Sequence, residues 1–297
     1  MSAYLDPIDE APALRDVMRS LAGIAGFQAY RFLDDVAGEH KRYETFKIVC
    51  PDRTLVLKQY DSETRYAAEK AICDLFPADL PVPRMLAASD NRILTEFIPG
   101  ADLMTATDAG IAAAGKSIAE IMNAFPFDRA YDRTFADEEI AYREKRLPCL
   151  RNEPLLSAAY EAFLARAKQM PLTLANGDLV PINCIFTGER VFLIDWEYGG
   201  FLPYALDLGR FLAHSGADEA ATYRMTDAQK RLFLDTVYEN LRQKPDRAEF
   251  DRDVGFAILD ESVMILRFYL EDPSEVRGAD YTRYYEQAIA LAKELLG

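Results

Sequence analysis

The pattern of hydrophobic positions changes its period near residue 100. Before that point, apolar residues first recur at three- and four-residue spacing over residues 8–24, which predicts an amphipathic helix. Three β-branched or aromatic runs follow, separated by short polar turns: 27–33, 43–49 and 54–60. Such runs predict an antiparallel meander. Residues 62–76 then show helical spacing, and 92–100 predict a further strand.

Beyond this point the spacing is mostly helical. An apolar face covers 111–125, and further helical patterns cover six segments: 136–147, 154–169, 204–214, 226–243, 247–270 and 279–296. Only two short strands are expected among them, near 183–186 and 190–194. These patterns predict a small β-rich lobe, residues 1–97, and a larger helical lobe, residues 98–297. The predicted fold class is therefore α+β with two lobes.

Composition and charge narrow the class of protein. The chain has 297 residues, of which 50% are hydrophobic and 28% charged, so it can bury a sizeable core. No apolar run approaches the ~20 residues that span a bilayer, and the acidic start MSAYLDPIDE is unlike a signal peptide. The net charge of −15 repels nucleic acid and anionic membranes. We therefore expect a cytoplasmic protein with neither as a partner.

One segment matches a phosphate-binding motif by its letters alone. GIAAAGKS, residues 110–117, fits the P-loop pattern G-x-x-x-x-G-K-[ST]. A P-loop must follow a strand directly and form a non-helical nest of N–H groups. Here the preceding residues are not strand-like, and the helical stripe of 111–125 passes through Lys116 and Ser117. A coincidence inside a helix is favoured, with a P-loop NTPase as the weaker alternative.

A second pattern points to phosphoryl transfer with more support. In LANGDLVPINCIF, Asp178 and Asn183 are five apart, as in the kinase catalytic loop D-L-x-x-x-N, and Asp195 follows the apolar run VFLI. In that chemistry the first aspartate orients the acceptor hydroxyl and takes its proton. The asparagine and the second aspartate hold Mg²⁺ on the nucleotide phosphates, and hard oxygen ligands suit this ion. The pattern predicts a kinase that uses ATP or GTP.

The matching lysine and its partner lie upstream. Lys58 stands within the third predicted strand, where a kinase carries the lysine that contacts the α- and β-phosphates. A charged residue in an apolar strand needs a partner. In the following helix, Glu69 shares a face with apolar residues, whereas Glu63 lies on the more polar side. Glu69 is therefore the predicted partner of Lys58, and a surface pair without function is the alternative.

Two further segments are candidates for nucleotide contacts. The predicted turn at 34–42 would cover the phosphates, but it contains only Gly38 and no glycine-rich signature. Backbone amides near this glycine are the candidates there. The strand that carries Glu96, Phe97 and Ile98 would form the hinge, and its backbone would hydrogen-bond adenine. An ordinary edge strand is the alternative.

These segments together resemble the aminoglycoside phosphotransferase and choline kinase family, which are small-molecule kinases with a protein-kinase-like fold. NGDLVPINCIF is similar to the family's catalytic loop H-G-D-L-x-x-x-N, LIDWEYGG to its metal-binding segment, and YALDLGRF to the helix that follows. VLKQY and TEFIPG also fit its lysine strand and hinge. The resemblance implies a protein-kinase-like bilobal fold, ATP or GTP with Mg²⁺, a small-molecule hydroxyl acceptor, and a monomer or homodimer.

The resemblance also implies roles for single residues. It assigns Asp178 as the catalytic aspartate. Asn183 and Asp195 would be the Mg²⁺ ligands, and Lys58 and Glu69 the phosphate-binding pair. Asp207 would steady the catalytic loop, and Arg210 would be structural. Asn176 stands where the family usually has histidine, and its amide would replace part of that histidine's hydrogen bonding. A catalytically degenerate kinase-like protein that binds nucleotide is the alternative.

The acceptor site is expected from residues after Asp195 and from the C-terminal helices. Its candidates are carboxylates and aromatic residues: Glu197, Tyr198, Tyr204, Asp260, Glu261, Tyr269 and Glu271. Such groups would bind an ammonium group by charge and by cation–π contact; alternatively, the aromatics are core and the acids a solvated face. The single tryptophan, Trp196, is expected in the core. The expected acceptor is an amino-alcohol such as choline, an aminosugar or aminoglycoside, or a sugar.

Overall fold

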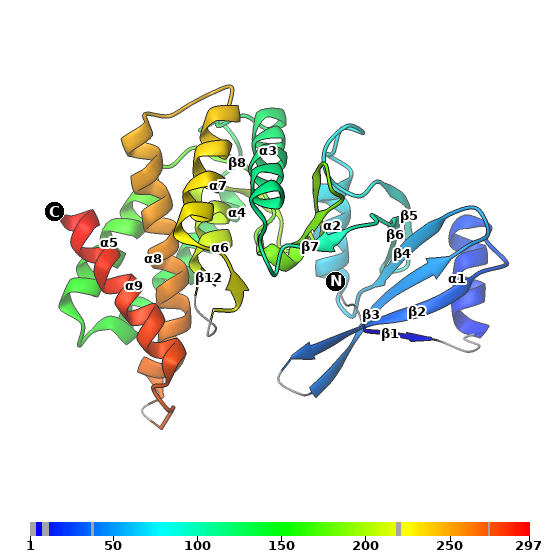
Figure 1. Ribbon diagram of the computed structural model, residues 1–297, viewed down its shortest axis with the longest axis horizontal. Helices are drawn as coiled ribbons and strands as arrows, with labels where there is room; N and C mark the ends of the chain where they lie inside the picture. Colours follow the sequence, from blue (N-terminus) through cyan, green and yellow to red (C-terminus); the bar gives the residue numbers. More distant parts are fainter. Residues whose placement is uncertain (1–3, 8–11, 37–38, 218–220, 273) are drawn as a thin grey trace.

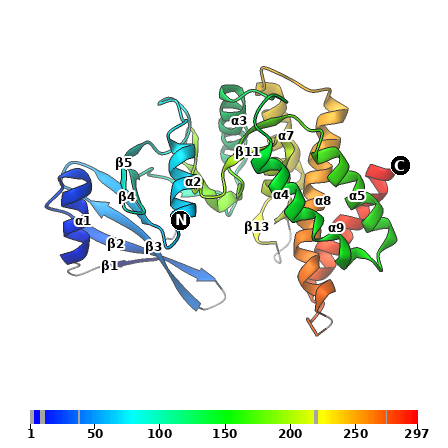
Figure 2. The same cartoon turned by 180° about the vertical axis from the view of Figure 1, so that it is seen from behind.

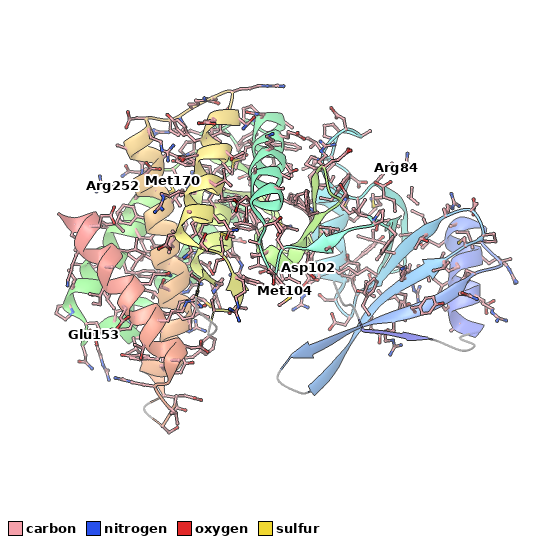
Figure 3. The ribbon with its side chains drawn as sticks, viewed as in Figure 1. Arg84, Asp102, Met104, Glu153, Met170 and Arg252 are labelled. Carbon is pink, nitrogen blue, oxygen red and sulfur yellow. The ribbon has the colours of Figure 1, made fainter. Side chains whose placement is uncertain are left out.

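The chain forms a β-rich lobe joined to a larger helical lobe (Figure 1). The computed structural model describes residues 4–7, 12–36, 39–217, 221–272 and 274–297. The segment around Asp102 and Met104 lies where the chain passes from one lobe to the other (Figure 3). The hydrophobic core of the larger lobe also takes in Ile72, Leu80 and Val82. The division at residue 97 therefore stays a prediction.

The β-rich lobe is built on one antiparallel sheet of six strands, in the order β1-β2-β3-β4-β6-β5. Its strands are β1 Tyr4–Pro7, β2 Gln28–Val36, β3 Glu39–Val49, β4 Thr54–Gln59, β5 Met85–Ser89 and β6 Arg92–Glu96. The predicted meander is confirmed by β2, β3 and β4, whereas β1 was not predicted. β6 lies inside the sheet, so the alternative of an edge strand is wrong.

Helix α1, Pro12–Ala22, packs on one face of this sheet. Its Leu14 and Met18 form a buried cluster with Leu55 and Leu57 of β4. Because successive side chains of a strand point to opposite faces, Lys58 lies on the other face. That face meets α2, Glu63–Cys73, whose first turn is capped by Ser62. Both views place α2 between the sheet and the helical lobe (Figures 1 and 2).

The hairpin of β2 and β3 corrects the predicted turn at 34–42. The two strands extend through most of this segment, up to the pair Val36–Glu39. Gly38 lies outside the described residues. The proposed backbone contact to phosphates near this glycine therefore stays a prediction.

The larger lobe packs its helices around a single hydrophobic core. The helices are α3 Asp108–Ala124, α4 Thr134–Glu144, α5 Pro154–Ala167, α6 Ala205–Ala213, α7 Asp227–Asn240, α8 Arg247–Glu271 and α9 Ala279–Leu296, with 3₁₀ turns at Leu147–Leu150 and Pro181–Asn183. The predicted helical segments are confirmed to within a few residues at their ends. None of the helices described has the length and apolar character that a membrane crossing needs.

Short strands connect the loops of this lobe. They are β7 Ala101–Asp102, β8 Leu172–Ala175, β9 Cys184–Phe186, β10 Val191–Leu193, β11 Gly200–Pro203, β12 Ser215–Gly216 and β13 Tyr223–Arg224. β9 and β10 confirm the two predicted strands; β9 pairs with β10 on one side and with β7 on the other. The remaining strands were not predicted, since runs of two to four residues give no readable period.

The P-loop-like segment 110–117 lies inside α3. A Cβ atom on Gly115 would come within 2.9 Å of Thr236 on α7, so the glycine permits close helix packing. Lys116 is exposed, and the backbone N–H groups of this stretch belong to the helix. The prediction of a coincidental match is confirmed.

Candidate active site

The loop after β8 depends on a glycine. β8 pairs with β11, and the chain then turns through Asn176, Gly177 and Asp178. Gly177 has φ +77°, and a Cβ atom there would lie 2.1 Å from the carbonyl oxygen of Tyr198. Only glycine combines this backbone conformation with such a close approach.

Asp207, in the first turn of α6, holds the backbone of this loop. Its Oδ2 accepts a hydrogen bond from the N–H of Asn176 at 2.6 Å, and its Oδ1 accepts one from Gly177 at 3.0 Å. Burial raises the pKa of Asp207 to about 6, although the two backbone N–H groups oppose the shift. The predicted contact of Asp207 with the loop is therefore confirmed.

Asn176 connects this loop to the segment that carries Asp195. Its Oδ1 accepts from the N–H of Asp178 at 3.2 Å, and its Nδ2 donates to the carbonyl oxygens of Ile194, at 3.2 Å, and Asp195, at 2.9 Å. Asp195 has φ +61°, a left-handed conformation that is uncommon outside glycine. The fully buried Asn176 thus supplies hydrogen bonds that hold a strained residue.

We expect Asn176→Ala to lower kcat by roughly 10- to 100-fold, because small displacements of catalytic groups are costly. It should also lower the free energy of unfolding by about 1–3 kcal/mol, since buried polar groups lose their partners. Steady-state kinetics and urea denaturation measure both effects. Asn123→Ala is the matched control, because Asn123 bridges the backbones of Asn240 and Arg242 elsewhere in the lobe. An equal loss of kcat in both variants would contradict the prediction.

Asn183 connects the loop of Asp178 to the segment that carries Asp195. Its Nδ2 donates to the backbone carbonyl oxygen of Asp178 at 2.9 Å, and its backbone carbonyl oxygen accepts from the N–H of Ile194 at 3.0 Å. The side-chain oxygen is thus the atom of Asn183 that remains available to bind a metal ion. Asp178, Asn183 and Asp195 belong to one hydrogen-bonded unit.

Lys58 brings the two lobes together at this unit. Its Nζ lies 2.5 Å from Oδ1 of Asp195, 2.7 Å from Oε2 of Glu69 and 3.5 Å from Oε2 of Glu197. Burial lowers the pKa of Lys58, but the charges of Asp195 and Glu69 outweigh it and raise the pKa above its usual range. Lys58 is therefore charged, and the predicted choice of Glu69 over the exposed Glu63 is confirmed.

The carboxylates around Lys58 also form a candidate metal site. Oxygen atoms of Glu69, Asp195 and Glu197 lie within 4.8 Å of one another, the one such group among the described residues. The hydroxyl of Tyr60 donates to Oε2 of Glu69, and the N–H of Trp196 donates to Oε1 at 3.4 Å. This all-oxygen donor set fits the preference of Mg²⁺.

The hinge residues differ in their availability for a nucleotide. The N–H of Glu96 donates to the carbonyl oxygen of Arg84, and that of Phe97 donates to Thr54 at 3.3 Å. Among the described residues, no backbone hydrogen bond involves the N–H of Ile98. The adenine contact of this segment stays a prediction, and Ile98 is the residue whose N–H is available for it.

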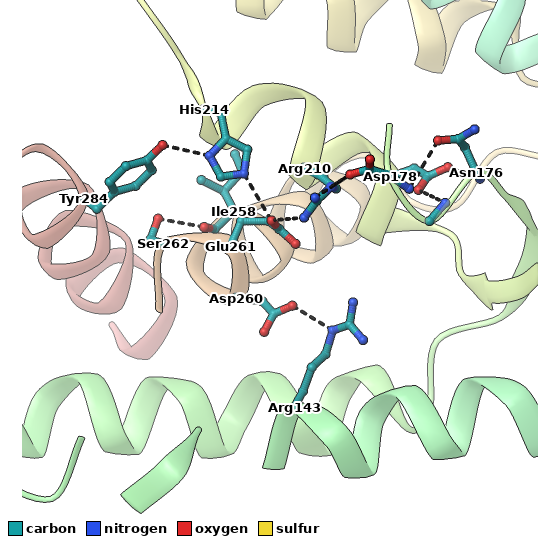
Figure 4. Close-up of polar contacts among 12 residues, drawn as sticks. Arg143, Asn176, Asp178, Arg210, His214, Ile258, Asp260, Glu261, Ser262 and Tyr284 are labelled. Atoms are coloured by element: carbon teal, nitrogen blue, oxygen red, sulfur yellow. Dashed lines mark hydrogen bonds and ion pairs between the residues drawn. The ribbon is translucent and has the colours of Figure 1, made fainter. Parts of the chain in front are cut away.

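Arg210 contacts Asp178 directly, which sequence reasoning missed (Figure 4). Its Nε and Nη2 lie 2.8 and 2.5 Å from Oδ1 of Asp178. The role predicted for Arg210 was structural, and this contact adds the partner that the prediction lacked. A signal was present, because Asp207 and Arg210 are three residues apart and thus share a helix face. Burial raises the pKa of Asp178, and Arg210 opposes this shift.

Comparison with known proteins gives the family. Residues 38–243, more than half of the chain, match the model of the phosphotransferase enzyme family, APH. The chain belongs to this family. A curated relative, protein LicA of Haemophilus influenzae, is 30% identical over 95 residues, which are 32% of each protein. The match thus spans about a third of the length of that relative.

Solved structures share the fold of this chain. Choline kinase LicA from Streptococcus pneumoniae superposes with a TM-score of 0.61 at 14% identity, over 95% of this chain and 98% of the other. Macrolide 2′-phosphotransferase MphH from Brachybacterium faecium gives 0.55 at 17% identity, over 94% and 97%. Spectinomycin phosphotransferase APH(9)-Ia, in complex with ADP and spectinomycin, gives 0.53 at 12% identity, over 97% and 99%. The predicted family and bilobal kinase-like fold are confirmed.

Two of the acceptor candidates lie in the core of the larger lobe. Tyr204 is 1% exposed, and its hydroxyl donates to Oδ2 of Asp253 at 2.8 Å. Asp260 is fully buried and accepts from Arg143, Arg146 and Tyr160 at 2.6–2.8 Å. The structure corrects both candidates, because neither side chain has surface left for a substrate. Trp196 is buried as predicted.

The other candidates separate into two groups. Tyr269 and Glu271 lie near the end of α8, where Tyr269 packs on Tyr281 and Glu271 pairs with Arg267. Ten residues of helix separate Glu271 from Glu261, about 15 Å along the axis. The structure therefore does not bring Tyr269 and Glu271 to Asp178.

Glu197, Tyr198 and Glu261 do lie near the site. Glu197 belongs to the carboxylate group around Lys58. Tyr198 is 45% exposed, and its backbone contacts the loop glycine. Glu261 is buried, and Arg210 and His214 already pair with its carboxylate.

We expect Asp260→Asn to lower the free energy of unfolding by about 3–5 kcal/mol, because it removes the carboxylate that pairs with the buried Arg146 and with Arg143. Urea denaturation measures the loss. Glu271→Gln on the same helix is the control and should change stability by less than about 0.5 kcal/mol, since its side chain is exposed. Unchanged stability in Asp260→Asn with a raised KM for the acceptor would contradict the prediction.

Proposed function

We propose that this phosphotransferase transfers the γ-phosphoryl group of ATP or GTP to a hydroxyl group of a small molecule. The contact of Lys58 with Asp195 at 2.5 Å supports this most directly. It joins the lysine strand of the β-rich lobe to the loops that carry Asp178 and Asn183. Glu69, at 2.7 Å from the same Nζ, completes the pair that kinases use to contact phosphates.

Asp178 would orient the acceptor hydroxyl and take its proton. The transition state of phosphoryl transfer is loose, so the position of this carboxylate matters more than its basicity. Its neighbours support the role, since Asp207 holds the backbone before it and Asn176 accepts from the N–H of Asp178. The N–H of Ile98 would bind the adenine or guanine base.

Asn183 and Asp195 would hold Mg²⁺, with Glu69 or Glu197 close enough to contribute oxygen atoms. When bound, the ion would offset the negative charge of the phosphates. Lys58 would contact the α- and β-phosphates. These metal and nucleotide roles are supported by the donor set and the short contacts of the described side chains.

The acceptor would be an amino-alcohol, an aminosugar or a sugar. Asp260 and Glu261 are each paired with arginine, which disfavours a cation site made of these two carboxylates. The exposed Tyr198 and Glu197, whose contact with Lys58 is longer at 3.5 Å, are the remaining candidates for an ammonium group. A cytoplasmic location and a monomeric or homodimeric state stay predictions.

Release of ADP and GDP in the presence of Mg²⁺ tests the proposal. The acceptor panel contains choline, ethanolamine, aminoglycosides, macrolides, homoserine and simple sugars. We expect stimulation by one acceptor class, lost in Asp178→Ala and retained in Lys116→Ala. Nucleotide binding without turnover across the panel would instead support the degenerate kinase.

A further inference from the structure

Arg210 links the side chain of Asp178 to a buried carboxylate of α8 (Figure 4). Its Nε and Nη2 both donate to Oδ1 of Asp178, at 2.8 and 2.5 Å. Its Nη1 donates to Oε2 of Glu261 at 2.7 Å. One planar guanidinium group therefore spans the gap between the catalytic loop and the helix.

The far side of Arg210 is fixed by a chain of hydrogen bonds. Glu261, whose side chain is 6% exposed, also contacts Nε2 of His214 at 3.2 Å. Nδ1 of His214 lies 2.7 Å from the hydroxyl of Tyr284 on α9. Burial raises the pKa of Glu261, but Arg210 and then His214 outweigh this effect and lower the pKa to about 2. A charged carboxylate held by His214, which in turn contacts Tyr284 of α9, thus anchors the guanidinium group.

The same face of α6 holds the loop in two separate ways. Asp207 accepts from the backbone N–H groups of Asn176 and Gly177, and Arg210 donates to the side chain of Asp178. The backbone and the carboxylate of the loop therefore have independent supports. Support of the backbone alone would leave the carboxylate free to rotate.

Both N–H groups of Arg210 meet the same oxygen of Asp178. Among the described residues, no hydrogen bond or ion pair involves the other oxygen, Oδ2. Two donors on Oδ1 restrict rotation about the Cβ–Cγ bond and thereby fix the direction of Oδ2. A fixed acceptor atom is what a hydroxyl group needs for a near-attack geometry.

We propose that Arg210 is a positioning residue, which orients the carboxylate of Asp178 toward the acceptor hydroxyl and is itself held by Glu261. This inference rests on the proposed function, because it takes Asp178 as the group that receives the proton. Glu261 then serves as an anchor for Arg210 and not as a ligand for a cationic acceptor.

Arg210→Ala tests this role through the split between kcat and KM. We expect kcat to fall by about 100-fold, the scale of a 1 Å misplacement, while KM for the nucleotide changes little. Low concentrations of guanidinium chloride should restore part of kcat, because the free ion can occupy the space between the two carboxylates. Arg210→Lys should lose less kcat than Arg210→Ala, since it keeps the positive charge. It should still fall below the wild type, because a single ammonium group cannot reproduce the three contacts.

Arg166→Ala is the matched control. Arg166 donates through Nε and Nη2 to Asp253, two turns before Glu261 on α8. It should keep the wild-type kcat and show no activation by guanidinium. A wild-type kcat in Arg210→Ala, or a loss that guanidinium does not relieve, would overturn the inference.

Glu261→Gln keeps the test decisive if Arg210→Ala does not fold. Loss of the anchor should lower kcat and leave KM for the nucleotide unchanged, and an unchanged kcat overturns the inference. A wild type that is inactive with every acceptor overturns both this inference and the proposed function. An active wild type, inactivated by Asp178→Ala but not by the Arg210 variants, overturns the positioning role alone.

Discussion

Asp178→Ala is expected to lower kcat by about 10²- to 10⁴-fold, the usual contribution of a positioned proton acceptor. The dissociation constant of the nucleotide should change little, since Lys58, Asn183 and Asp195 remain. ADP or GDP release with the acceptor identified in the panel measures kcat, and calorimetry measures nucleotide binding. The two readings together separate loss of chemistry from loss of binding.

Asp251→Ala is the control for this experiment. Asp251 lies on the exposed side of α8, where it pairs with Arg247 at 2.9 Å. Such a surface pair contributes about 0–1 kcal/mol, and its loss should leave kcat at the wild-type value. An Asp178→Ala variant with more than a tenth of the wild-type kcat would contradict the assignment of Asp178, since a catalytic base contributes at least about 10²-fold.

Lys58→Met is expected to lower kcat/KM for the nucleotide by roughly 10²- to 10³-fold, as for removal of one donor that stabilises a transition state. It should also leave the carboxylates of Glu69, Asp195 and Glu197 without their shared counter-charge. In the absence of nucleotide, Mg²⁺ should therefore bind this variant more tightly. The metal-dependent rise in Tm should be larger in Lys58→Met than in the wild type.

Thermal unfolding with and without Mg²⁺ measures the second effect. Lys70→Met is the matched control, because Lys70 lies on α2 and pairs only with the exposed Asp74 among the described residues. It should show wild-type kinetics and a wild-type response to Mg²⁺. Equal Mg²⁺ responses in all three proteins would contradict a metal site among these carboxylates.

The helices could be predicted because their periods are local. The pattern at 226–243 corresponds to α7, Asp227–Asn240, which begins with a capping box at Thr226. The strands β8 and β11 have four residues each, and they pair across a separation of more than 20 residues. A short apolar run has no period that distinguishes a strand from a buried helical turn. These strands form only because the chain brings them together.

The sequence by itself determined which residues carry the chemistry proposed for the loop, since the spacing of Asp178, Asn183 and Asp195 is a local property of the chain. It could not give the partners of the acidic residues on α8. Asp260 and Glu261 are adjacent in sequence, yet one pairs with Arg143 and Arg146 and the other with Arg210.

Only the tertiary structure decided these pairings, because they depend on which helix packs against which face. The packing of α6 on α8 places Arg210 between Asp178 and Glu261. Burial then makes each pairing obligatory, since an unpaired charge in the core is costly. Residue type and spacing therefore indicated the candidate reactive residues. Packing determined which carboxylates are paired in the core and which lie at the site.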